Sequence, residues 1–71
     1  MSPSSVLPKV DTVISFLQSA LIEMTKTRES VLNDTHNIDE NFLVTAQELM
    51  QQGSNLTDVL ISMVRKERGM R

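Results

Sequence analysis

A short polar stretch, Asn33 to Asn41 (NDTHNIDEN), holds the side chains best suited to catalysis. Thr35, His36 and Asp39 are the residue types of a nucleophile, a base and a carboxylate that orients the base. They stand in one polar turn, with no glycine-rich segment to bind an oxyanion and no apolar residues to wall a pocket. We therefore expect a solvated turn here and no enzymatic activity.

The composition gives little support to a metal or cofactor site. The chain has no cysteine and one histidine, which excludes thiolate sites, disulfides and histidine-rich metal sites. The stretch Gln51 to Asp58 (QQGSNLTD) has one glycine, unlike a phosphate-binding loop or a dinucleotide motif. The acids of the polar stretch also lack the alternating spacing of an EF-hand. We expect no metal and no cofactor.

Nucleic-acid binding has one supporting feature, the cluster of basic residues at the end of the chain. These residues are Arg65, Lys66, Arg68 and Arg71. The net charge is −2 and there is no Tyr or Trp, so the body of the protein offers little to phosphates or bases. A helix–GSN–helix arrangement has the size of a helix-turn-helix, but Leu49 stands where that motif needs a small residue. Asp58, near the start of the second helix, would oppose phosphate. We expect the basic residues to complement a helix dipole, with a DNA-binding regulator as a further alternative.

The length of 71 residues allows one domain at most. Such a chain buries little apolar surface, and without a disulfide or metal we expect self-association or a partner to stabilise it. No signal-peptide pattern is visible. The most apolar window, Val10 to Met24, is 15 residues long and contains Asp11 and Glu23, which is too short and too charged for a membrane span. We expect a cytoplasmic protein without a membrane span.

Helical periodicity accounts for most of the chain. We predict a flexible start over 1–7, a helix over 8–32 with Pro8 in its first turn, and a loop over 33–38. A second helix over 39–52 follows, capped by Asn37 or Asp39. The apolar stripe of the first helix consists of Val10, Ile14, Leu17, Leu21, Met24 and Val31, widened by Val13 and Ala20.

The segment around Gly53 allows two outcomes. Gly53 suits the position after a helix end, and Asn55 with Asp58 resembles a cap that starts a third helix over 55–68. The apolar face nevertheless keeps its register across this segment. Its members recur every seven residues as Phe42, Leu49, Leu56 and Met63, beside a companion row of Ala46, Gly53, Leu60 and Glu67. Local chemistry favours a break, whereas the phase of the apolar residues favours one continuous helix.

We therefore predict an all-α fold, either a helical hairpin or a three-helix bundle, that associates into a larger helical bundle. The expected function is a small protein–protein interaction module, such as a regulator, adaptor or small chaperone. It would act as a homo-oligomer, a dimer or tetramer, or with another helical protein. A structural subunit of a helical assembly or filament is the alternative. The candidate interface residues are Phe16, Ile22, Phe42, Leu49, Leu56, Leu60 and Met63, and we expect Leu17, Leu21, Leu49 and Leu60 to be buried, in the fold or in an interface.

Overall fold

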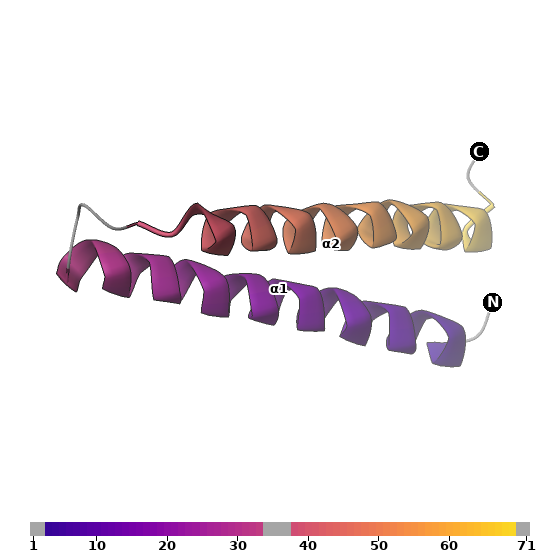
Figure 1. Cartoon of the computed structure of the whole chain (residues 1–71). Coiled ribbons are helices and arrows are strands. Elements are labelled where there is room, and N and C mark those ends of the chain that lie inside the picture. The colour runs from indigo at the N-terminus through magenta and orange to yellow at the C-terminus, as the bar shows by residue number, and fades with distance from the viewer. Residues whose placement is uncertain (1–2, 34–37, 70–71) are drawn as a thin grey trace.

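Two long helices lie side by side and antiparallel in a computed structural model of the chain, which describes residues 3–33 and 38–69 (Figure 1). Helix α1 spans Pro3–Asn33 and helix α2 spans Glu40–Glu67. The hairpin is elongated, with extents of 53 × 21 × 14 Å. The predicted all-α helical hairpin is confirmed, and the described residues form no strand.

Helix α2 runs through Gly53 without a break, so the residues expected to form a third helix continue the second. The polar side chains that could have capped a new helix instead bond within the continuous one. The side-chain amide of Gln51 donates from Nε2 to Asn55 Oδ1 at 2.9 Å, and the hydroxyl of Thr57 donates to the backbone carbonyl of Gly53 at 2.7 Å. Of the two outcomes that the sequence allows, the structure has the one that follows the phase of the apolar residues.

The start of α2 is set by Asp39, one of the two caps that the sequence suggests. Its backbone is extended, and its Oδ1 accepts a hydrogen bond from the N–H of Asn41 at 2.9 Å. Glu40 lies in the first turn and Arg65 and Lys66 lie in the last, so charges of both signs complement the helix dipole. Thr35 and His36, and most of the expected 33–38 loop, lie outside the described residues.

Helix α1 begins at Pro3, which corrects the expected flexible start over 1–7 and the expected first turn at Pro8. Pro3 takes the first helical position, where the missing N–H of a proline is no loss. Pro8 lies inside the helix and cannot donate to the carbonyl of Ser4, so one helical hydrogen bond is missing there. The hydroxyl of Thr12 donates to the carbonyl of Pro8 at 2.9 Å.

The seam between the two helices has small residues at its centre. Ala20 is 4% exposed, Ala46 is 0% exposed, and Gly53 is buried as well. Phe16 and Val13 of α1 pack over Gly53: a Cβ added there would lie 3.8 Å from Phe16 Cβ and 4.0 Å from Val13 Cγ1. None of the large side chains in the described residues is fully buried. The helices therefore approach closely but bury little apolar area.

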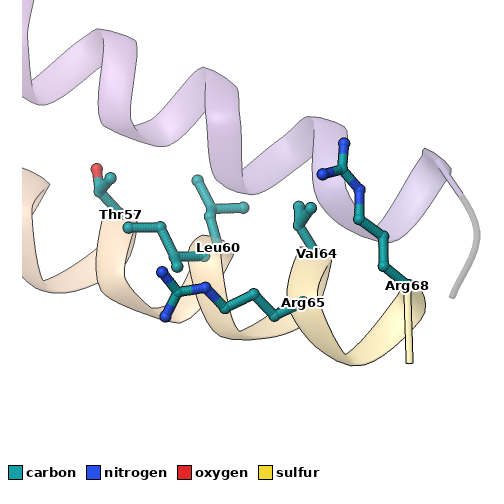
Figure 2. Close-up of a pocket in the computed structure, with 6 residues that line it drawn as sticks. Thr57, Leu60, Val64, Arg65 and Arg68 are labelled. Atoms are coloured by element: carbon teal, nitrogen blue, oxygen red, sulfur yellow. The ribbon is translucent and has the colours of Figure 1, made fainter. Parts of the chain in front are cut away.

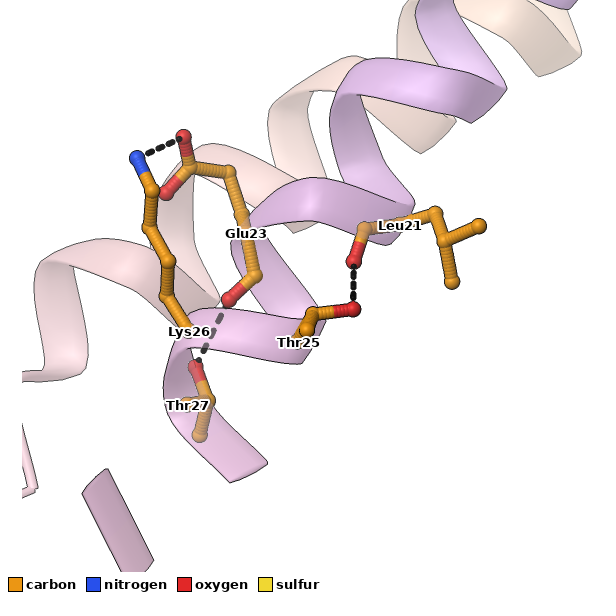
Figure 3. A network of polar contacts seen from close by, with 5 residues as sticks. All are labelled: Leu21, Glu23, Thr25, Lys26 and Thr27. Atoms are coloured by element: carbon orange, nitrogen blue, oxygen red, sulfur yellow. Dashed lines mark hydrogen bonds and ion pairs between the residues drawn. The ribbon is translucent and has the colours of Figure 1, made fainter. Parts of the chain in front are cut away.

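Half-buried residues flank this centre along both helices. They are Val6, Lys9, Val10, Val13, Phe16, Glu23, Thr27 and Ser30 of α1, and Phe42, Leu49, Leu56, Leu60 and Met63 of α2. Thr27 is polar, but its hydroxyl donates to the carbonyl of Glu23 at 3.1 Å (Figure 3). Such a bond to the preceding turn satisfies the hydroxyl within its own helix. No buried side-chain nitrogen or oxygen in the described part of the chain lacks a hydrogen-bond partner.

Replacing Gly53 by alanine tests the geometry of the seam. The new methyl group would stand at ordinary van der Waals distance from Phe16 and Val13, and alanine is the better helix former. We expect Gly53→Ala to raise the free energy of unfolding by about 0.5–1 kcal/mol in urea titrations at fixed protein concentration. The matched opposite change, Ala46→Gly, should lower it by about 1 kcal/mol or more. A destabilised Gly53→Ala variant would show that the helices pack more closely than described.

Candidate interaction surface

The most apolar stripe of α1 points away from α2. Leu17 is 51% exposed and Leu21 is 66% exposed, so the hairpin alone does not bury these two residues, which the sequence predicts to be buried in the fold or in an interface. Leu49 and Leu60, predicted in the same way, are half-buried at the seam. The hairpin thus does not bury the predicted stripe of α1. We call this face the outer stripe, and it consists of the exposed Leu7, Ile14, Leu17, Leu21, Met24 and Val31, with the half-buried Val10 at its edge toward the seam.

Helix α1 carries two apolar rows with a seven-residue repeat, and only one of them can face α2. Val13, Ala20 and Thr27 recur every seven residues and lie at the seam. Ile14 and Leu21 follow directly after two of these residues and therefore lie about 100° further round the helix. The row with the small Ala20 faces the small Ala46 and Gly53 of α2. The row with the larger residues is left outside.

A groove on α2 continues the apolar character of this face. It has a volume of about 320 Å³ and is lined by Thr57, Leu60, Ile61, Val64, Arg65 and Arg68 (Figure 2). Ile61 is 42% exposed, so the groove is open to a partner. Because the helices are antiparallel and each side chain follows the helical period, Ile61 and Val64 face the same way as the outer stripe of α1. The groove and the outer stripe together form one apolar face.

The opposite face is polar. Lys26 Nζ lies 3.4 Å from Glu23 Oε1 and 5.6 Å from the centroid of the Phe42 ring. Figure 3 shows the side chain of Leu21 pointing away from this Glu23–Lys26 pair. Lys26 therefore links the two helices at the end near the loop through a cation–π contact and neutralises the half-buried Glu23. The hairpin thus has one apolar face and one mainly polar face, on which Ile22 and Val59 are the exposed large apolar residues.

The hairpin exposes more surface than a compact protein of its mass. Its accessible surface is 5557 Å², whereas a compact monomer of 8.0 kDa exposes about 4,450 Å². Its radius of gyration is 16.4 Å, against about 11 Å for a compact domain of this length. The excess surface, about 1,100 Å², exceeds the roughly 800 Å² that each partner contributes to a typical interface.

The seven candidate interface residues divide unequally between the seam and the surface. Six of them contribute to the contact between α1 and α2: Phe16, Phe42, Leu49, Leu56, Leu60 and Met63. Ile22 is 55% exposed and lies on neither the seam nor the outer stripe. Sequence reasoning missed Leu7 as part of the exposed surface and left open whether Leu17 and Leu21 are buried in the fold or in an interface. The signal that reveals them is the second seven-residue row on α1.

The other predicted chemistries can be placed on the fold. A helix-turn-helix needs a turn between Gly53 and Asn55, and α2 is continuous there. Arg65, Lys66 and Arg68 lie at the end of α2, and Arg71 lies outside the described residues. No group of three or more His, Cys, Asp or Glu within 3–33 and 38–69 could hold a metal ion.

Helix α1 is also long and apolar enough, by length and composition alone, to cross a membrane. The qualifying stretch is Ser5–Asn33, which is longer than the Val10 to Met24 window judged too short from the sequence. Little of it is buried in the hairpin, in keeping with the exposed outer stripe. Lipid therefore has to be weighed against protein as the partner of this face.

Comparison of the chain with protein-family models, curated proteins and solved structures found no match. The physical features of the hairpin are therefore the basis for a functional hypothesis. The most distinctive of them is the apolar face formed by the outer stripe of α1 and the groove on α2.

The polar face yields a prediction about Lys26. Removing its ammonium group in Lys26→Ala should lower the free energy of unfolding by about 0.5–1 kcal/mol, because a cation–π contact and an ion pair are both lost. Lys26→Arg should keep most of the stability, since guanidinium also pairs with carboxylate and stacks on rings. Thermal unfolding followed by circular dichroism would measure both variants. Equal stability of the wild type and Lys26→Ala would contradict a role for this contact.

Proposed function

We propose that the chain is a non-enzymatic protein–protein interaction module and that a helical partner covers its apolar face. The observation that carries this proposal is the continuous exposure of large apolar side chains along α1. The members of the outer stripe that are exposed by 44% or more are Leu7, Ile14, Leu17, Leu21 and Met24, and Ile22 and Leu32 are exposed outside it. Single exposed apolar residues are ordinary on protein surfaces, whereas a contiguous apolar patch marks an interaction site.

The energetics of the hairpin support the same proposal. Among the residues that the structure describes, the buried hydrophobic ones are two alanines, Ala20 and Ala46. Complete burial of one leucine or isoleucine contributes about 1.5–3 kcal/mol, while ordering the backbone of each residue opposes folding by about 1–2 kcal/mol. Covering the outer stripe would add several such contributions at no further backbone cost. Association is therefore the most direct source of stability for this chain.

A protein partner suits the apolar face better than lipid does. A helix inside a membrane is apolar all round, whereas α1 has Asp11, Glu23 and Glu29 on its other sides. Helices that lie on membranes carry mainly Lys and Arg on the polar side, where they attract anionic lipids. The polar sides of α1 are instead mixed in charge. A heptad-like stripe of leucine and isoleucine matches the side of another amphipathic helix.

The proposal is tested by removing the apolar character of the outer stripe. In Leu17→Gln/Leu21→Gln both central residues become polar, and in the control Ile22→Gln an equally exposed residue outside the stripe changes. We expect the wild type and the control to show either self-association with a melting temperature that rises with protein concentration, or a weak, non-cooperative melt. The first result indicates a second copy as partner, and the second a different protein.

Two outcomes would contradict the proposal. The first is a monomer in sedimentation that melts cooperatively and is unaffected by the double change, because such a hairpin would not need its stripe covered. The second is stripe-dependent binding to phosphatidylcholine vesicles without self-association, which would assign the face to lipid. Open-ended growth in sedimentation would instead favour the filament subunit.

A further inference from the structure

We propose that the partner is a second copy of this chain, which docks its outer stripe antiparallel on the first to form a four-helix bundle. This inference rests on the proposed function and specifies the occupant of the apolar face. In the dimer the two α1 helices lie in contact, and the loop ends of the two hairpins point in opposite directions. The groove on α2 lies on the same face and turns toward the second copy.

The spacing of the outer stripe makes it self-complementary. Its residues alternate in steps of three and four from Leu7 to Val31, with Arg28 filling the remaining position. Two such stripes brought together antiparallel form matched layers when Leu17 of one copy meets Leu21 of the other. The same register then pairs Ile14 with Met24 and Leu7 with Val31. Leucine pairs thus occupy the centre, as in an antiparallel coiled coil.

The charged side chains of α1 and of the two hairpin ends favour the antiparallel orientation over the parallel one. The antiparallel register places Arg28 in the layer of Val10, next to Asp11 of the other copy, where the charges are opposite. A parallel dimer would place the two Arg28 side chains in one layer, where they repel. The hairpin is also polarised along its length. The loop end carries net −2 from Glu23, Lys26, Arg28, Glu29, Asp39 and Glu40, and the open end carries net +1 from Lys9, Asp11, Asp58, Arg65, Lys66, Glu67 and Arg68.

The apolar face is large enough for a stable dimer. The hairpin measures 53 Å by 21 Å across its broad side, so one face offers up to roughly 1,100 Å², against about 800 Å² per partner in a typical interface. This estimate agrees with the excess of exposed surface over a compact monomer. A second copy of the same size covers the whole face at once.

Cysteine cross-linking tests the orientation, because the chain has no cysteine of its own. Leu7→Cys and Val31→Cys variants are oxidised separately and as a mixture refolded together from urea, and covalent dimers are detected on non-reducing gels. Two copies of residue 7 in the antiparallel dimer would lie roughly 36 Å apart along the axis, beyond the reach of a disulfide. We expect covalent dimers in the mixture at least tenfold above those in either variant alone. Ile14→Cys and Met24→Cys form a second pair in case a change near the helix end disturbs folding.

The outcomes separate this inference from the proposed function. Cross-linking of each variant with itself, without cross-links between Leu7→Cys and Val31→Cys chains in the mixture, would show a parallel dimer. This result would overturn the antiparallel inference while association stands. A monomer without cross-links and without a cooperative melt would overturn self-pairing and leave a different protein as partner. A monomer with a cooperative melt that survives Leu17→Gln/Leu21→Gln would overturn both.

Discussion

Two helices can bury only one stripe each against one another, and this limit governs the whole hairpin. The seam is centred on Ala20, Ala46 and Gly53, whose small size lets the backbones approach closely. Close approach leaves little room for large side chains, so the seam gains packing density but little buried area. The larger apolar residues of α1 are left on the outside. The hairpin therefore has the form of one layer of a helical bundle, which is why we propose that a second layer comes from another molecule.

The sequence leaves the course of α2 open, because the local signals favour a break at Gly53 and the periodicity favours one continuous helix. The apolar rows cross Gly53 in register, and a break would lose that register. Gly53 packs against Phe16 and Val13 of α1, so the glycine lies within the contact between the helices instead of ending a helix. Asn55 resembles a cap, yet its side chain bonds to Gln51 one turn earlier. Asp39, with an extended backbone, is the actual cap.

The face of α1 that contacts α2 could not be predicted in the same way. Periodicity identifies apolar rows but does not rank them, and α1 has two adjacent rows that both repeat every seven residues. Hydrophobicity favours the outer stripe with Leu17 and Leu21 as the contact face, whereas the fit to Ala46 and Gly53 favours the row of Ala20. That choice depends on the partner helix and not on α1 alone. The start of α1 was also ambiguous in the sequence, because Pro3 and Pro8 can each take the first position of a helix. The structure begins the helix at Pro3.

Polar residues at the seam show that the contact between α1 and α2 does not require an apolar side chain at every position. Thr27 bonds back to a carbonyl of its own helix, and Glu23 is paired with Lys26, so neither needs a partner across the seam. The contact between α1 and α2 thus tolerates threonine and even a carboxylate at positions where leucine would fit the apolar pattern. Closing the hairpin therefore does not explain why leucine, isoleucine and methionine are concentrated in the next row of α1. We propose that their seven-residue repeat, which Arg28 interrupts, serves a second contact with a helix of another molecule.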